Sequence, residues 1–253
     1  SYSADSMSNF AIQAGTPANV QLTSNPEGET VTADGTSKIT YTATVEDTAG
    51  NALDGVSVQA DASSGSNIDI NENGAATTSS TDSNGEVAFD VTSTDSQDVS
   101  IIFTEQANSN SASGSATFEA GAAESISVVT EPAETTADET IQGSPEAKVV
   151  DANDNPVDGI DVTVSRSDGN GFDSGTETVS TSDGVATFGD LEIHSPGTYQ
   201  LEFDASEVEN TATSNEFDVL SGSASQVELT GPSSVTAGEQ SSDFTLEVQD
   251  QYG

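Results

Sequence analysis

Two groups of residues in this chain could do chemistry, and the richer one is the acidic and amide run between Asp151 and Asp158. Calcium is bound by six to eight oxygen ligands, and this run offers several carboxylate and amide oxygens close together. Asp151, Asp154 and Asp158 are therefore candidate ligands for Ca²⁺. The alternative, which we favour, is a polar hairpin turn, because an earlier copy of the run, Asp47–Asn51, has fewer carboxylates.

The second group centres on His194, the only histidine of the chain. A Ser-His-Asp site would have to use this residue, yet the surrounding Glu192–Gly197 indicates a strand end that enters a turn. Composition also removes thiol nucleophiles and cysteine-based zinc sites, because the chain has no Cys. Carboxylate pairs remain, but the candidates fall in turns or on the outer faces of strands. We expect no enzyme activity.

The elements that carry these residues recur along the chain. The Val45–Val56 segment returns at Val149–Ile160, and it begins a third time at Val248–Gly253. The separations are 104 positions from Asp47 to Asp151 and 99 positions from Asp151 to Asp250. Repeats of about a hundred residues indicate whole domains in tandem, since solenoid repeats have periods of roughly 20 to 50 residues.

Within each repeat the apolar residues alternate with polar ones. Ile39, Tyr41, Ala43 and Val45 alternate with three threonines, and later segments of both repeats show the same period of two. Alternation of β-branched and aromatic residues between Gly, Asn, Asp and Ser clusters is typical of half-buried strands. About seven strands per hundred residues predict an all-β fold of tandem immunoglobulin-like antiparallel β-sandwiches arranged as a rod.

Short junctions of small residues divide the array at Ala14–Pro17, Ala120–Ala123 and Ser221–Ala224. We therefore expect four segments. Residues 1–14 are the last strand of a preceding Ig-like domain, 15–120 and 121–221 are Ig-like domains, and 222–253 begin a further one. Junctions of this length leave little slack, which favours a semi-rigid rod. We also expect the targeting and anchoring parts to lie outside this segment.

The charge of the chain is extreme. Asp and Glu number 44 against 3 Lys and Arg, for a formal net charge of -41. Such a surface repels itself in dilute buffer, whereas the Debye length falls to about 3 Å at 1 M salt. The composition therefore predicts a protein that works in brine and holds hydrated cations diffusely. It excludes nucleic acid, because three cations cannot neutralise a phosphate backbone.

The repeated motifs resemble the bacterial immunoglobulin-like repeats of the invasin and intimin type, found in surface adhesins and in haloarchaeal surface proteins. The resemblance is carried by Asp47–Val56 and Asp151–Ile160, by Thr81–Phe89 with its echo Asp183–Phe188, and by Pro196–Leu201. It implies an Ig-like fold and a stalk-like role, with no catalytic residue. Asp151–Pro156 also looks like the calcium-binding linker of cadherins, although that linker lies between domains.

Three functions remain open from the sequence. The favoured one is a structural stalk or fibre of an extracellular, cell-surface or virion-surface protein, whose partners are the neighbouring Ig-like domains. The second is an adhesin or viral fibre that binds a receptor through its own loops, with Gly169–Phe172 as the candidate. The third is a homo-oligomeric fibre, in which Ser1–Gln13 of one subunit completes Ser225–Gly253 of the next by strand donation. No apolar run long enough to span a membrane occurs, so we expect no direct membrane insertion in this segment.

Overall fold

The computed structural model describes residues 15–24, 29–137 and 139–253. These residues divide into two compact units, one ending at Gly121 and the other beginning at Ala122. All the elements of the described residues are β-strands, and no helix among them has the length and hydropathy that a membrane span requires. The predicted all-β class is confirmed. The strand expected at residues 1–14 lies outside the described residues.

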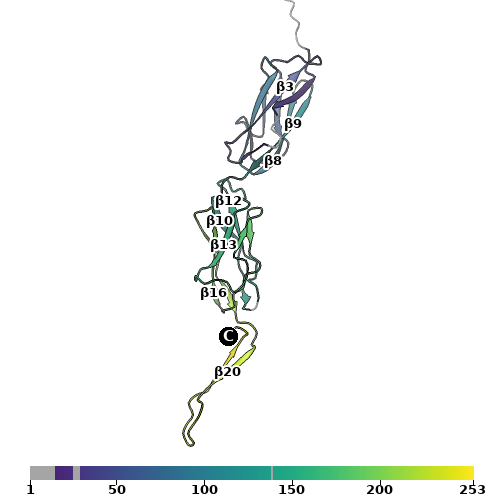
Figure 1. The fold of residues 1–253 in the computed structure, drawn as a ribbon. Helices are drawn as coiled ribbons and strands as arrows, with labels where there is room; N and C mark the ends of the chain where they lie inside the picture. Colours follow the sequence, from purple (N-terminus) through teal and green to yellow (C-terminus); the bar gives the residue numbers. More distant parts are fainter. Residues whose placement is uncertain (1–14, 25–28, 138) are drawn as a thin grey trace, which may run out of the picture. The chain divides into compact units, whose positions relative to one another are not determined.

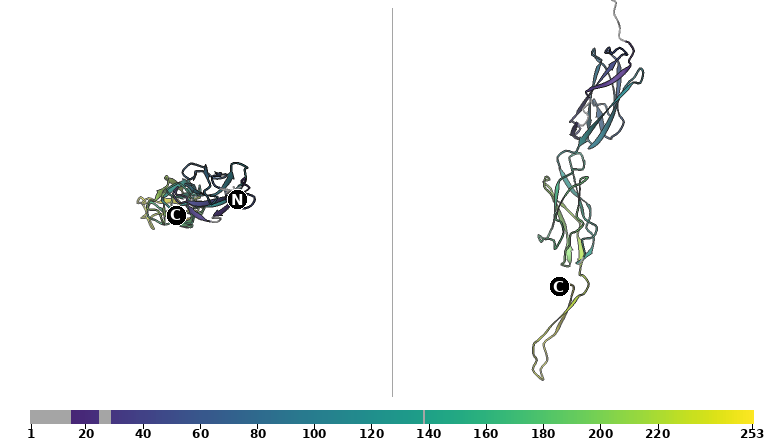
Figure 2. Two further views of the ribbon diagram at one scale, coloured as in Figure 1. Left: turned by 90° about the horizontal axis from the view of Figure 1, so that it is seen from above. Right: turned by 45° about the vertical axis from the view of Figure 1, so that its right-hand side comes forward.

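The first unit is a sandwich of two sheets (Figure 1; Figure 2, right). One sheet has the order β1-β3-β7-β5 and the other the order β2-β9-β8-β4-β6. The described strands of this unit are β1 Asn19–Ser24, β2 Thr30–Thr32, β3 Ile39–Glu46, β4 Ser57–Ala62, β5 Ile68–Ile70, β6 Ala76–Ser80, β7 Glu86–Ser93, β8 Gln97–Glu105 and β9 Ser111–Glu119. These nine strands exceed the expected seven, because three-residue strands such as β2 and β5 are too short to show an alternating pattern.

Alternation along the long strands creates the core of this unit. In β3 the residues from Ile39 to Val45 are buried at every second position, and β8 follows the same pattern. A strand presents successive side chains to opposite faces, so each strand contributes one apolar row. The rows meet around Phe103, whose ring centroid lies 5.3 Å from that of Tyr41 and 5.5 Å from that of Phe89.

The second unit repeats this plan with shorter strands. Apart from the β20–β21 hairpin described below, its strands form three sheets, with the orders β10-β12-β15, β11-β19-β16 and β14-β13-β17-β18. The described strands are β10 Ser125–Thr130, β11 Thr135–Thr136, β12 Glu146–Val150, β13 Asp161–Arg166, β14 Thr178–Ser180, β15 Val185–Thr187, β16 Gly197–Tyr199, β17 Leu201–Ala205, β18 Ala212–Thr213 and β19 Phe217–Leu220. Its core includes Phe188 and Phe203, with ring centroids 5.5 Å apart.

Ser214 marks the point where the second unit departs from the first. The long β8 and β9 pair without a break, whereas the corresponding strands are interrupted beside Gln200 and Ser214. The Ser214 hydroxyl accepts a hydrogen bond from the Leu201 N–H (3.0 Å) and donates one to the Asn215 carbonyl (2.8 Å). A side chain thus satisfies backbone groups that a regular ladder would pair.

A tight turn precedes β7 and β15 at matching places in the two units. Gly85 and Gly184 both have positive φ, at 73° and 72°. A Cβ on Gly184 would lie 2.5 Å from the Cβ of Pro156, and one on Gly85 would lie 2.8 Å from the Val45 carbonyl oxygen. Both the backbone conformation and the close approach therefore require glycine.

The hairpin of β20 Gln226–Thr230 and β21 Thr245–Gln249 completes the described chain (Figure 2, right, yellow). Val227 pairs with Val248, and Leu229 pairs with Leu246. These four side chains are 60 to 65% exposed. The matching pairs Val20–Val45 and Ile126–Val149 are buried in the two sandwiches. The hairpin therefore has the strand pairing found in each sandwich, but its apolar side chains are exposed to solvent.

Candidate functional site

The repeated aspartate forms a hydrogen-bonded loop. Asp47 Oδ1 accepts hydrogen bonds from the N–H groups of Ala49 (2.8 Å) and Asn51 (3.0 Å), and Oδ2 accepts one from Gly15 N–H (2.8 Å). The Asn51 side chain also donates to Oδ2, at 2.9 Å. One buried carboxylate thus organises the loop after β3 and fastens the junction residue Gly15 to it.

The other two copies of this aspartate make related contacts. Asp151 Oδ1 accepts from the N–H groups of Asn153 (2.8 Å) and Asn155 (2.9 Å), and Oδ2 accepts from the Asn155 side chain. Asp250 accepts from the N–H of Tyr252 and from that of the junction residue Gly222, each at 2.9 Å. The repeated motif is therefore a structural loop whose ionised aspartate satisfies backbone donors.

The stability that these loops contribute should decrease at low pH. Hydrogen bonds to the ionised form, first from the Asn51 side chain and then from the Asn51 and Gly15 N–H groups, hold the pKa of Asp47 well below its usual value of 3.8. The pKa of Asp250 is lowered by the N–H groups of Tyr252 and Gly222. A lowered folded-state pKa contributes stability that is complete above 3.8 and is lost as the pH falls through the folded-state pKa.

We therefore expect the midpoint of urea unfolding to fall as the pH drops from 5 to 2, and Asp47→Asn to weaken that dependence. The matched control is Asp54→Asn, at an exposed position of the same loop region. Fluorescence of Tyr41, the tyrosine buried in the core of the first unit, reports the transition. An Asp47→Asn variant with the full acid dependence of the parent chain would contradict this assignment.

The three candidate calcium ligands occupy different parts of the β12–β13 connection. Asp151 is buried in its loop, Asp154 has a left-handed backbone with φ of 66°, and Asp158 Oδ1 accepts a hydrogen bond from Gly184 N–H (2.8 Å). Across residues 15–24, 29–137 and 139–253, no group of three or more His, Cys, Asp or Glu side chains is placed to hold a metal ion. Calcium binding by these three residues stays a prediction.

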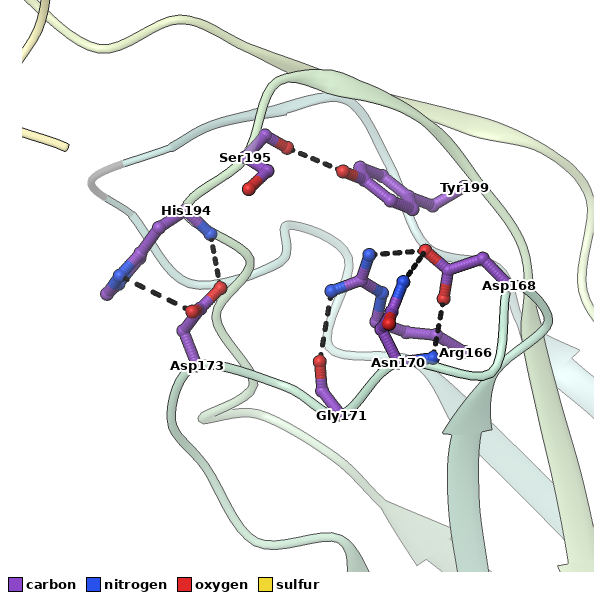
Figure 3. Close-up of polar contacts among 8 residues, drawn as sticks. All are labelled: Arg166, Asp168, Asn170, Gly171, Asp173, His194, Ser195 and Tyr199. Atoms are coloured by element: carbon purple, nitrogen blue, oxygen red, sulfur yellow. Dashed lines mark hydrogen bonds and ion pairs between the residues drawn. The ribbon is translucent and has the colours of Figure 1, made fainter. Parts of the chain in front are cut away.

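Arg166 organises the loop that follows β13 (Figure 3). Its Nη1 donates to the Gly171 carbonyl (3.0 Å), its Nη2 donates to Asp168 Oδ2 (2.5 Å), and its guanidinium carbon lies 4.4 Å from the centroid of the Tyr199 ring. The Tyr199 hydroxyl in turn donates to the Ser195 carbonyl (2.8 Å). The side chain of Arg166 is only 7% exposed, whereas that of its partner Asp168 is 37% exposed.

The Arg166 loop has a fixed tip. Asp168 accepts hydrogen bonds from the backbone N–H and the side chain of Asn170. These bonds, with the Asn170 N–H the largest cause and Arg166 a smaller one, lower the pKa of Asp168. Phe172 is half-buried and packs against the core of the second unit. The exposed part of the loop is therefore polar, at Gly169 and Asn170, and the aromatic ring serves packing.

His194 lies beside the Arg166 loop and is held by carboxylates. Its backbone N–H donates to Asp173 Oδ2 (2.7 Å), its ring Nε2 lies 3.2 Å from Glu192 Oε2, and the ring stacks on that of Tyr252 with centroids 3.8 Å apart. Glu192 forms isolated bridges to Thr140 and Ser174 in place of the expected strand end. These contacts describe an anchored side chain at the end of the second unit.

Sequence reasoning missed the pairing of Arg166 with Tyr199. A signal was present, because Arg166 is the only arginine of a chain that holds 44 acidic residues. Arg166 also continues the row of inward-facing positions formed by Val162 and Val164. A single arginine at such a position indicates a buried guanidinium with specific partners. Asp168 and Gly171 are local partners, but Tyr199 lies more than 30 residues away in the sequence, and no local pattern identifies it.

Comparison with known proteins places residues 19–119 with the family described as bacterial Ig-like domain (group 1). The match covers β1 to β9, which is the whole sandwich of the first unit. No curated protein matches the chain in sequence. The sequence resemblance to Ig-like repeats is thus confirmed for the first unit.

Two solved structures, those of InvD and FdeC, show the same fold. InvD of Yersinia pseudotuberculosis is 17% identical with a TM-score of 0.56, over 88% of this chain and 68% of that one. The Escherichia coli adhesin FdeC is 16% identical with a TM-score of 0.54, over 96% and 77%. The structure of invasin, an integrin-binding protein, has 17% identity and a TM-score of 0.40, and this chain covers 42% of its length. Identities of this size show the fold alone.

Proposed function

We propose that this chain is a stalk or fibre segment of an extracellular, salt-adapted surface protein that projects a distal functional region. The observation that carries the proposal is that two sandwiches, each with its own core, follow one another with a junction of a few residues. β9 ends at Glu119 and β10 begins at Ser125. In the proposed stalk, a junction of this length would leave little slack between neighbours. The neighbouring domains are then the principal partners of each unit.

The structural relatives support a surface location, because FdeC is described as an adhesin. We carry this over to the present chain as part of the proposal. The proposal of a salt-adapted, haloarchaeal protein is supported by the acidic composition and by the exposure of most of the described acidic side chains. The few buried ones are Asp47, Glu105, Asp151 and Asp250.

The proposed organisation has Ig-like domains at 15–120 and 121–221 and the beginning of another at 222–253. The exposed apolar face of the β20–β21 hairpin supports the last of these. The pairs that match Val227–Val248 are buried in both sandwiches, so the hairpin carries side chains of a core that further strands would cover. Exposed apolar faces of this kind are unfavourable in water.

Salt is expected to stabilise the chain strongly. Raising NaCl from 0.1 to 2 M should increase the melting temperature by about 10 °C or more, because screening removes the repulsion among carboxylates. A variant with Glu207→Gln, Glu209→Gln and Glu216→Gln removes three exposed charges and should show a smaller increase. Calorimetry of both proteins in NaCl and in isomolar sucrose separates screening from general solute exclusion. Equal increases in the two solutes would contradict salt adaptation.

The surface location is tested on cells that express the native protein. Antibodies raised against residues 15–221 should label intact cells kept in molar salt, and the native polypeptide should have a mass far above 25.6 kDa. An antibody against a cytoplasmic protein of the same cells is the control for intactness. Labelling only after lysis would contradict the surface location, and a native mass near 25.6 kDa would contradict the stalk.

A receptor-binding role is the second candidate, and one observation favours it. The loop from Ser167 to Asp173 is held by Arg166 and presents Gly169 and Asn170 to solvent. Rigid scaffolds that display fixed loops are the usual arrangement of binding sites. If the chain adheres to cells, Asn170→Ala should reduce adhesion without changing the melting temperature.

A further inference from the structure

One edge strand of the first unit lacks the usual protection against pairing with another chain. β6 lies at the end of the five-stranded sheet and pairs only with β4 among the described strands. Its sequence, Ala76-Thr77-Thr78-Ser79-Ser80, contains no charge and no proline. Natural edge strands are commonly protected by charged residues, proline, bulges or short length. β6 has none of these in a chain that is otherwise rich in carboxylates.

The ladder with β4 determines which backbone groups of β6 face outward. The Ala75 carbonyl accepts from Ala62 N–H (2.8 Å), and Thr81 N–H donates to the Val56 carbonyl (2.9 Å). In an antiparallel pair, residues that exchange hydrogen bonds recur at every second position. The backbone groups of Ala76, Thr78 and Ser80 therefore point away from β4, and their side chains are exposed as well.

The other edge strands differ from β6 in ways that limit pairing. β1 and β10 are interrupted by register shifts, at Leu22/Ser24 and Val128/Thr130. β2, β5, β14 and β15 have only three residues, and β5 carries Asp69. The β4–β6 register runs without a shift over five pairs. Among the described edge strands of the two sandwiches, β6 is the longest that is both regular and uncharged.

We propose that β6 pairs with β6 of a second copy of this chain, antiparallel and about a two-fold axis through Thr78. Thr78 then lies opposite Thr78 of the second copy, and Ala76 lies opposite Ser80. The outward N–H and carbonyl groups of these three residues make the new hydrogen bonds, so the two five-stranded sheets become one continuous sheet. The strand is its own complement, because small uncharged side chains face one another at every pair.

Salt controls this association. The contact strip carries no carboxylate that would need to be desolvated, while the two chains each have a net charge of -41. Long-range repulsion therefore opposes the encounter in dilute buffer and is screened in molar salt. The side-by-side pairing of chains through β6 would link neighbouring stalks laterally, which is a different assembly from the head-to-tail strand donation considered above.

A cysteine at the two-fold axis tests the geometry, because the parent chain has no cysteine. Residues that exchange hydrogen bonds across an antiparallel pair have Cα atoms about 5.5 Å apart, which is within disulfide range. In 2 M NaCl, Thr78→Cys should form a disulfide-linked dimer at least tenfold faster than Ser80→Cys, whose two copies lie four residues out of register. Equal rates for the two variants would overturn the proposed pairing.

Proline tests the hydrogen bonds. Thr78→Pro removes an outward N–H without breaking the β4–β6 ladder, and it should raise the dimer dissociation constant at least tenfold in sedimentation equilibrium. Thr178→Pro is the matched control, because Thr178 holds the same outward position on the short β14 and should leave dimerisation unchanged. Calorimetry confirms that both variants remain folded. A parent chain that stays monomeric at about 0.5 mM in 2 M NaCl, or a Thr78→Pro variant that dimerises fully, would overturn the proposal.

Discussion

Replacement of Phe103 by alanine is expected to lower the free energy of unfolding of the first unit by about 3 to 5 kcal/mol. Phe103 is fully buried between Tyr41 and Phe89, so its removal loses apolar burial and leaves a cavity in a core that can collapse only partly. The total free energy of unfolding of a small domain is only about 5 to 15 kcal/mol. The variant should therefore unfold at a much lower temperature than the parent chain.

Calorimetry distinguishes this effect from a general loss of stability. The two core clusters share no residue, so Phe103→Ala should shift the transition of the first unit and leave that of the second in place. Phe203→Ala, at the matching place in the second unit, should do the reverse. Phe103→Leu retains most of the volume and should cost less. If both transitions moved together in either alanine variant, the two units would not unfold as separate cores.

Replacement of Arg166 by methionine is expected to destabilise the second unit by about 2 kcal/mol. Methionine fills much of the same space but loses the hydrogen bond to the Gly171 carbonyl and the cation–π contact with Tyr199. The ion pair with Asp168 contributes little, because the Asp168 carboxylate is 37% exposed and solvent screens it. We therefore attribute the expected destabilisation to the lost contacts with the Gly171 carbonyl and the Tyr199 ring.

Two companion variants check this assignment by urea unfolding. Asp168→Asn should leave the unfolding midpoint close to that of the parent chain, and Arg166→Lys should resemble Arg166→Met, because lysine lacks the planar fork that reaches Gly171 while covering Tyr199. Hydrogen exchange adds a local measurement, since Ser167 N–H donates to the Gln200 carbonyl and should exchange faster when the loop loosens. A large destabilisation by Asp168→Asn with none by Arg166→Met would reverse the assignment.

The features that could be predicted from the sequence are local ones. Alternating rows such as Ile39, Tyr41 and Ala43 determine a half-buried strand, because a strand with one buried face requires a period of two. Turn residues also follow from local chemistry, since Gly85 and Gly184 have positive φ, a backbone conformation that glycine adopts at no steric cost. The tandem organisation followed from the spacing of the repeated aspartates alone.

The role of the repeated aspartate could be predicted only in part. Its turn-like sequence indicated a hairpin connection, and the loops at Asp47 and Asp151 are turns held by their own carboxylates. The same residues also suggested calcium, because composition counts oxygen ligands without showing where they point. Only the folded loop shows that Asp151 directs both oxygens to Asn153 and Asn155.

Tertiary structure decided the features that join distant segments. The parallel pairing of β2 with β9 and the contact of Arg166 with Tyr199 bring together residues that no local pattern connects. The exposed edge of β6 also depends on tertiary structure. The sequence of Ser and Thr residues does not show which side of the strand pairs with β4 and which side faces solvent. Periodicity fixes which face of a strand is buried, whereas the identity of its neighbour depends on how the whole chain closes around its core.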